Sequence, residues 1–318
     1  MAKMARKIAF LFPGQGAQYI GMGEEFYQQY PKSKEIFHQA SEILGYDLAT
    51  LCFKGPKSQL DQTEYTQPAL LTVSVAILEV LKGIGIQPDV TAGLSLGEYT
   101  ALVCSGGFDF STAVALVQKR GKYMQEAVPQ GIGGMAAVLG LEGMIVQELC
   151  QQVKDQGWVA PANFNCPGQI VVGGEIKGVK ALCKVAKEAG AKRTILLDVS
   201  APFHTAMLKP AAEQLKKELE KIAIGTIQIP YITNTTGEYI TDASQVKSIL
   251  AKQVMSPVLW EKSIRRMLKE GINCFIEIGA GKVLSRFVRK IDSSVHILSI
   301  ENLSTLEKTV EAMGGKIC

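Results

Sequence analysis

A pentapeptide with serine at its centre constrains this chain more than any other feature. Gly93-Leu94-Ser95-Leu96-Gly97 follows an apolar stretch at 89–94 and precedes a helical pattern at 99–105. A glycine on each side lets the backbone turn sharply from strand into helix, which exposes the serine hydroxyl at the edge of a sheet. The pentapeptide alone is a weak signal in a chain with 31 glycines. With its flanking strand and helix it predicts a nucleophilic serine on an α/β fold, and the alternative is an ordinary strand-to-helix turn.

The remaining pattern alternates strands and helices, with an interruption in the middle. Expected strands lie at 7–12, 227–232, 274–278 and 295–300, and expected helices at 32–44, 111–127 with Ser111 as N-cap, 246–253 and 257–270. Another helix is expected to begin near Pro68 and to end at Gly83. Within 129–198 the order becomes strand 135–139, helix 142–156, strands 158–163 and 169–172, helix 177–189 and strand 193–197. This βαββαβ order is typical of a ferredoxin-like unit. We therefore predict a large domain formed by 1–128 and 199–318, with a small domain at 129–198 inserted into it.

Composition excludes several classes of protein. With 47% apolar and 20% charged residues the chain is typical of a folded globular protein. The net charge of +4 is too small to indicate nucleic-acid binding. None of the seven cysteines forms a Cys-x-x-Cys pair, so no metal site is expected and the thiols fit a reducing, cytoplasmic compartment. The longest apolar stretch, 69–81, is interrupted by polar residues and is shorter than the ~18 residues of a membrane span, so no membrane association is expected.

A nucleophilic serine needs a base, and the chain has three histidines. His38 lies in an amphipathic helical pattern and His296 in an apolar strand, whereas His204 follows a strand in a loop, where catalytic residues tend to be presented. Elimination favours His204. The oxyanion of an acyl-transfer intermediate needs two N–H donors. We expect them from Leu96, which follows the serine, and from Gln15, which lies between glycines after the first strand. The glycine-rich segments at 14–19 and 281–283 do not match phosphate-binding loops.

The motifs taken together closely resemble the malonyl-CoA:acyl carrier protein transacylases of type II fatty-acid synthesis, over nearly the whole chain. The matching segments are FPGQGAQ at 12–18, YTQPA at 65–69, GLSLGEY at 93–99, VQKR at 117–120, MQEAVP at 124–129, NFNCPGQ at 163–169, VSAPFH at 199–204, QVMSPV at 253–258 and FIEIG at 275–279. The resemblance implies an α/β-hydrolase-like large domain with an inserted ferredoxin-like small domain, in agreement with the pattern above. One position departs from the family, because Leu94 stands where the family usually has histidine.

The resemblance also implies a role for each matching residue. Ser95 would be the nucleophile and His204 the base, oriented by the backbone carbonyl of Gln253, while Gln15 and Leu96 would form the oxyanion hole. Arg120 would bind the free malonyl carboxylate, and the pocket would be lined by Gln67, Asn163 and Asn165. The substrates would be malonyl-CoA and the phosphopantetheine thiol of acyl carrier protein, with no cofactor, and a monomer is expected. From the pattern alone, a solvated position on a helix is favoured for Arg120, because charged residues on helices are usually exposed.

Two further interpretations remain open. A serine hydrolase would use an acidic residue between serine and histidine in the chain, and Asp198 lies in that order but only six residues before His204. A catalytically silent module that docks carrier protein would not need both Ser95 and His204. Binding of CoA phosphates and an acidic carrier would be favoured by basic patches. The segment 261–290 has eight Lys or Arg against three Glu, and we expect contributions from Arg286 and from Lys192 and Arg193.

Overall fold

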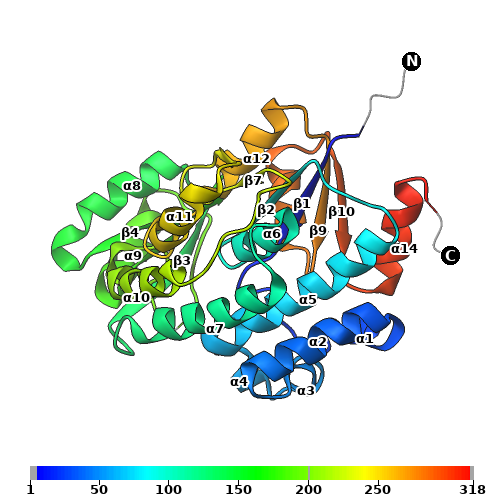
Figure 1. Cartoon of the computed structure of the whole chain (residues 1–318). Helices are drawn as coiled ribbons and strands as arrows, with labels where there is room; N and C mark the ends of the chain where they lie inside the picture. Colours follow the sequence, from blue (N-terminus) through cyan, green and yellow to red (C-terminus); the bar gives the residue numbers. More distant parts are fainter. Residues whose placement is uncertain (1–5, 200, 316–318) are drawn as a thin grey trace.

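The computed structural model describes residues 6–199 and 201–315, and it places two sheets side by side (Figure 1). The larger sheet has six strands in the order β10-β9-β1-β2-β7-β8. Its strands are β1 (Ile8–Phe12), β2 (Val90–Gly93), β7 (Tyr231–Ile232), β8 (Tyr239–Ile240), β9 (Cys274–Ile278) and β10 (His296–Ile300). All neighbouring pairs are parallel except β7 with β8.

The central strand β1 is buried on both faces, as its continuous apolar sequence predicts for a parallel sheet. Phe10 and Phe12 pack into one core cluster, whereas Ala9 and Leu11 pack into a second cluster on the opposite face. Helices lie on both faces of this sheet, some packed on the strands and others packed on the first layer of helices. They are α1 (Glu24–Gln29), α2 (Pro31–Leu44), α3 (Leu48–Lys54), α4 (Lys57–Leu60), α5 (Thr63–Gly83), α6 (Gly97–Ser105), α7 (Phe110–Glu126), α10 (Lys209–Glu220), α11 (Val246–Gln253), α12 (Trp260–Lys269), α13 (Val283–Ile291) and α14 (Leu303–Ala312).

The smaller sheet is antiparallel, with the order β4-β5-β3-β6. It consists of β3 (Gly133–Leu139), β4 (Val159–Cys166), β5 (Gln169–Glu175) and β6 (Arg193–Leu196), and it carries α8 (Gly143–Gln152) and α9 (Ile176–Glu188) on one face. Ala136 and Val138 of β3 pack under these helices, while Met135 and Ala137 belong to the core shared with the larger sheet. The second face of the small sheet is thereby turned toward the larger one.

Backbone hydrogen bonds join β4 of the small sheet to the segment between α11 and α12. Val258, which precedes α12, donates its N–H to the carbonyl of Ala162 at 2.9 Å and accepts from the N–H of Phe164 at 2.9 Å. These bonds hold β4 against the segment that joins α11, which ends at Gln253, to α12.

Several predicted boundaries were wrong. Helix α5 begins at Thr63, so Pro68 lies inside it rather than at its start; extensive burial of α5 offsets the hydrogen bond that proline cannot donate. The N-cap of α7 is Asp109, whose carboxylate accepts the N–H of Thr112, and not Ser111. The strand expected at 227–232 is reduced to β7, and the helix expected at 142–156 ends at Gln152, before a separate 3₁₀ turn. Among the described residues, six helices were not predicted, namely α1, α3, α4, α10, α13 and α14.

Candidate active site

Ser95 occupies a strained turn between β2 and α6. Its φ is +55°, a left-handed conformation that side chains rarely adopt. A Cβ on Gly93 would lie 1.9 Å from the backbone of Gly97, and one on Gly97 would lie 2.1 Å from the carbonyl oxygen of Phe12. Glycine is therefore required on both sides of the serine, and the nucleophile-elbow geometry expected from the sequence is present.

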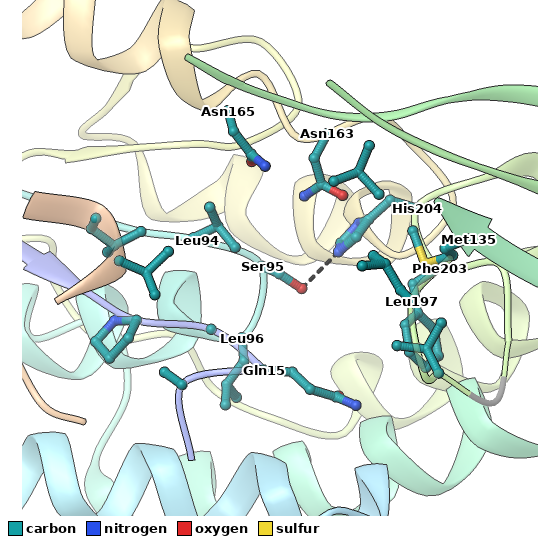
Figure 2. A pocket seen from close by; sticks show the side chains of 18 of the residues that line it. Gln15, Leu94, Ser95, Leu96, Met135, Asn163, Asn165, Leu197, Phe203 and His204 are labelled. Carbon is teal, nitrogen blue, oxygen red and sulfur yellow. Dashed lines mark hydrogen bonds between the residues drawn. The ribbon is translucent and has the colours of Figure 1, made fainter. Parts of the chain in front are cut away.

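His204 is positioned as the base. Its Nε2 lies 2.7 Å from Ser95 Oγ (Figure 2), and its Nδ1 lies 2.9 Å from the carbonyl oxygen of Gln253. Because a carbonyl only accepts, Nδ1 carries the proton and Nε2 is free to accept from the serine hydroxyl. Burial and then the charge of Arg120 lower the pKa of His204 to about 4. The imidazole is therefore neutral, and able to take a proton, at pH 7.

The interpretation with Asp198 as a triad acid is wrong for this geometry. Asp198 is exposed and lines a different pocket, whereas His204 is oriented by the backbone carbonyl of Gln253. A carbonyl can fix the tautomer of the ring without adding a charge. The pair of Ser95 and His204 is thus completed by a neutral acceptor.

Arg120, on α7, is buried with 1% of its surface exposed, so the solvated alternative is wrong. Its Nη1 donates to Gln67 Oε1 at 2.7 Å, and its Nη2 donates to Gln253 Oε1 at 2.9 Å and to Ser95 Oγ at 3.2 Å. The guanidinium also lies over the ring of Tyr99, 5.1 Å from its centroid. A buried cation is thereby held directly beside the nucleophile.

Two groups behind Ser95 were not identified from the sequence. Asn234 accepts the Ser95 N–H on Oδ1 at 2.6 Å and donates from Nδ2 to the carbonyl of Gly93 at 2.7 Å. Glu98 is fully buried and accepts from the backbone N–H of Asn234 and from Gln253 Nε2, both at 3.0 Å. Burial raises the pKa of Glu98 to about 7, although its hydrogen bonds and Arg120 act in the opposite direction. We call Gln67, Glu98, Arg120, Asn234 and Gln253 the Arg120 cluster.

A cavity of about 240 Å³ opens in front of Ser95. Gln15, Gln67, Leu96, Asn163 and Asn165 all line it, as expected. The N–H groups of Gln15 and Leu96 donate to no other group within the described part of the chain, which leaves both available to an oxyanion. Figure 2 shows Asn163 and Asn165 on the opposite side of Ser95 from Gln15 and Leu96. Asn165 Oδ1 is buried and has no partner among the described residues.

The other cavity walls are mostly apolar. The small sheet and the segment after β6 contribute one wall, which we call the small-sheet wall; its residues are Met135, Asn163, Asn165, Val171, Leu197, Val199 and Phe203. Helix α13 contributes Val283, Leu284 and Phe287. Leu94, at the position where the resemblance leads one to expect histidine, lines the cavity and packs with the core cluster that contains Leu284 and Phe287.

The basic candidates are exposed, and they lie in two places. Arg286 is on α13, one residue before the cavity-lining Phe287. Lys192 and Arg193 lie at the start of β6, opposite Leu139. Neither is among the described residues that line the cavity. Within residues 6–199 and 201–315 no cluster of side chains could hold a metal ion, and no helix is long and apolar enough to cross a membrane. Cys318 lies outside the described residues, and the six described cysteines are free.

The fold and the site define a serine-nucleophile enzyme built on an α/β fold, in which a buried arginine accompanies the nucleophile. The family model described as acyl transferase domain matches residues 9–312, so the chain belongs to the acyl transferase family. The malonyl CoA-acyl carrier protein transacylase of Bacillus subtilis (strain 168) is 47% identical over 308 residues, covering 96% of this chain and 97% of that protein.

Solved structures agree with the sequence relatives. The malonyl CoA-acyl carrier protein transacylase of Clostridium perfringens ATCC 13124 is 47% identical with a TM-score of 0.94, covering 97% of both chains. A malonyl-transacylase solved in complex with a type II PKS acyl-carrier protein is 39% identical with a TM-score of 0.94, covering 96% of this chain and 99% of that one. These similarities extend over the whole α/β framework and both sheets.

Proposed function

We propose that this protein transfers a malonyl group from malonyl-CoA to the phosphopantetheine thiol of acyl carrier protein, for fatty-acid biosynthesis. The observation that carries the proposal is the position of Ser95 Oγ, 2.7 Å from the base His204 and 3.2 Å from the guanidinium of buried Arg120. A nucleophile beside a buried cation suits an acyl group that ends in a carboxylate. The names of the relatives at 39–47% identity support the same substrates.

In the first half-reaction, His204 Nε2 takes the proton of Ser95 as the hydroxyl attacks the thioester carbonyl. The N–H groups of Gln15 and Leu96 stabilise the oxyanion that develops. The tetrahedral intermediate collapses, the carbon–sulfur bond breaks, and CoA leaves as a thiol with the proton from His204. A malonyl ester on Ser95 remains.

In the second half-reaction, the carrier's phosphopantetheine thiol occupies the position that CoA has left. Its sulfur attacks the Ser95 ester as His204 accepts the thiol proton, and the same two N–H groups stabilise the oxyanion. Collapse returns the proton to Ser95 and leaves the malonyl group on the carrier as a thioester. The neutral imidazole that burial maintains is suited to both proton transfers.

Arg120 gives selectivity for the acyl group. In the malonyl ester of Ser95, one methylene separates the acyl carbon from the free carboxylate. The carboxylate therefore lies within reach of the guanidinium beside Oγ. Arginine offers a planar pair of donors that matches a carboxylate. An acetyl group would leave the buried cation without its partner, which costs free energy and disfavours that substrate. Gln67 holds the guanidinium in place, and Asn163 and Asn165 would contact the substrate from the small sheet.

Our proposal extends to the domain organisation and the setting. Residues 1–128 and 199–318 would form an α/β-hydrolase-like domain, and 129–198 a ferredoxin-like domain; the strand order β4-β5-β3-β6 and a separate core under α8 and α9 support the latter. We propose a cytoplasmic monomer that needs no cofactor. Arg286, beside the cavity, is the best placed of the basic candidates for CoA or carrier, and Lys192 and Arg193 would act only at longer range.

Intact-protein mass spectrometry tests the proposal. Wild-type protein incubated with malonyl-CoA should gain one malonyl group, and addition of phosphopantetheinyl acyl carrier protein should move it to the carrier. Ser95→Ala should gain none, because the nucleophile is missing. A stable malonyl adduct on Ser95→Ala would refute the mechanism. Loss of the adduct to water as fast without carrier as with it would instead identify a hydrolase.

A further inference from the structure

One buried carboxylate of the Arg120 cluster has no part in the mechanism above. Glu98 is the second residue of α6, three residues after the nucleophile, and none of its surface is exposed. Burying a carboxylate is costly unless donors and a cation compensate for the lost water. Both of its hydrogen bonds are accepted on Oε2, from Asn234 and Gln253, which lie more than 130 residues away in the sequence, while Oε1 has no partner among the described residues.

Both donors also hold the reacting pair. Gln253 donates from Nε2 to Glu98 and to the carbonyl of Ser95, accepts Arg120 on Oε1, and presents its backbone carbonyl to His204. Asn234 donates its backbone N–H to Glu98 while its side chain accepts the Ser95 N–H. Glu98 is thus one bond away from the groups that fix the serine backbone and the histidine ring.

The amide of Gln253 has only one orientation that satisfies these neighbours. Arg120 can only donate, so it requires the amide oxygen, and the carbonyl of Ser95 can only accept, so it requires the amide nitrogen. A turned amide would place donor against donor and acceptor against acceptor. The guanidinium and the Ser95 carbonyl, with Glu98 as a second acceptor of the amide nitrogen, therefore fix the side chain of the residue whose carbonyl orients His204.

We propose that Glu98 is a positioning residue for acyl transfer: through Gln253 and Asn234 it fixes the Ser95–His204 geometry without touching substrate. The inference rests on the proposed function and adds a residue to it. A shift of about 1 Å in a reacting group can cost 10²-fold in rate, so a lost acceptor at this place has a measurable effect.

The test uses three variants and two reactions. Glu98→Gln removes the charge and keeps one acceptor, Glu98→Asp keeps the charge and withdraws it by one methylene, and Glu277→Gln is the matched control. Glu277 is buried and accepts two backbone N–H groups of α13, but it has no hydrogen bond to Ser95, His204 or Gln253 among the described residues. Single-turnover malonyl loading reports the full reaction. Phosphonylation by an uncharged fluorophosphonate reports Ser95–His204 reactivity without a carboxylate.

We expect Glu98→Gln and Glu98→Asp each to slow both reactions about tenfold or more. The fraction of enzyme that loads malonyl should stay as in wild type. The half-saturating malonyl-CoA concentration should remain within twofold of wild type. Glu277→Gln should lower the melting temperature but keep phosphonylation within twofold. Wild-type rates in Glu98→Asp would overturn the proposal. So would a loss of activity that is fully explained by a smaller fraction of active enzyme, with an unchanged rate constant. If one variant does not fold, the other retains the test.

A double-mutant cycle with Gln253→Met identifies the route. If Glu98 acts through the Gln253 amide, the combined loss of Glu98→Gln and Gln253→Met should be at least threefold smaller than the product of the single losses. Independent, multiplicative losses would overturn that route. Failure of the proposed function is recognised separately, because wild type would then not load malonyl while phosphonylation would still report the effect of Glu98.

Discussion

The two sides of Ser95 differ in how their polar groups are held. In the Arg120 cluster, every residue is at most 1% exposed and is hydrogen-bonded to another member or to Ser95 itself, although Glu98 Oε1 and Arg120 Nε have no partner among the described residues. On the small-sheet wall, the polar residues are Asn163 and Asn165, and the side chain of Asn165, with its buried Oδ1, has no hydrogen-bond partner at all among the described residues. The rest of that wall is apolar.

This contrast separates two tasks. The cluster is arranged in advance around charge, and a preorganised polar group needs no rearrangement as charge develops during reaction. The small-sheet wall offers apolar surface and an amide oxygen without a hydrogen bond. Such a surface suits the part of a substrate that must bind and then leave the cavity. We therefore expect substitutions in the cluster to change chemistry and acyl selectivity, and substitutions in the wall to change mainly the concentration of substrate that is needed.

Replacing the cation gives the largest expected effect. Arg120→Leu should lower kcat/KM for malonyl loading about 10²-fold, because two charge-assisted hydrogen bonds to the carboxylate are worth about 3 kcal/mol together. Loading from acetyl-CoA should fall less than threefold. Rapid-quench loading from both thioesters measures the ratio, with Arg120→Lys as the control that keeps the charge and loses the planar fork. Equal losses for both thioesters would mean that Arg120 supports the fold and not the carboxylate.

The contrast also explains what the sequence could and could not predict. Ser95 and His204 were accessible because each lies in a local context, an elbow between strand and helix and a loop after a strand. Gln15 followed from its position between glycines after the first strand, whereas Gln253 and Arg120 required a family resemblance, since nothing in their own neighbourhood distinguishes them. Glu98 and Asn234 were missed, although Glu98 is within a quoted motif. Their role depends on segments 136 and 155 residues apart in the chain meeting behind the serine.

The fold shows the same division between local and tertiary information. The burial of β1 on both faces follows directly from its apolar run, and the βαββαβ order of the small sheet follows from local periodicity. The start of α5 did not follow, because tertiary burial of its length outweighs the usual preference of proline for a first turn. The two-residue strand β7 is likewise set by its neighbours and not by its own longer apolar run.

The lowered pKa of His204 should be measurable in the pH dependence of phosphonylation. With its pKa lowered to about 4, His204 stays neutral until the pH falls through about 4, so phosphonylation should decline there and not near the ordinary value of about 6.5. At pH 5.5 an ordinary histidine would be only about one-tenth neutral, so the expected difference is about tenfold. The uncharged fluorophosphonate avoids titration of the substrate.

Variants from both sides extend this measurement. Arg120→Leu should raise the midpoint toward 6.5, because the charge of Arg120 is the second cause of the lowered pKa, whereas Asn165→Ala should leave it in place. Glu98, whose pKa is raised to about 7, titrates well above the midpoint expected for His204 and close to the ordinary histidine value, so Glu98→Gln is measured alongside to remove its contribution. A midpoint near 6.5 in wild type and in Glu98→Gln would contradict a cluster that holds His204 neutral.

The wall gives the smallest expected effect, and stability and binding should change in opposite directions. Asn165→Ala should raise the half-saturating malonyl-CoA concentration about threefold at an unchanged maximal loading rate, because the side chain lines the cavity, is proposed to contact the substrate, and has no hydrogen bond to Ser95, His204 or Arg120 among the described residues. A buried acceptor without a partner costs about 1–3 kcal/mol, so removing it should also increase the free energy of unfolding, measured by urea denaturation. Asn163→Ala is the neighbouring control, since Asn163 has no such buried unpaired oxygen within the described chain. A lower maximal rate in Asn165→Ala would show that the wall takes part in the chemistry and would remove the distinction between the two sides.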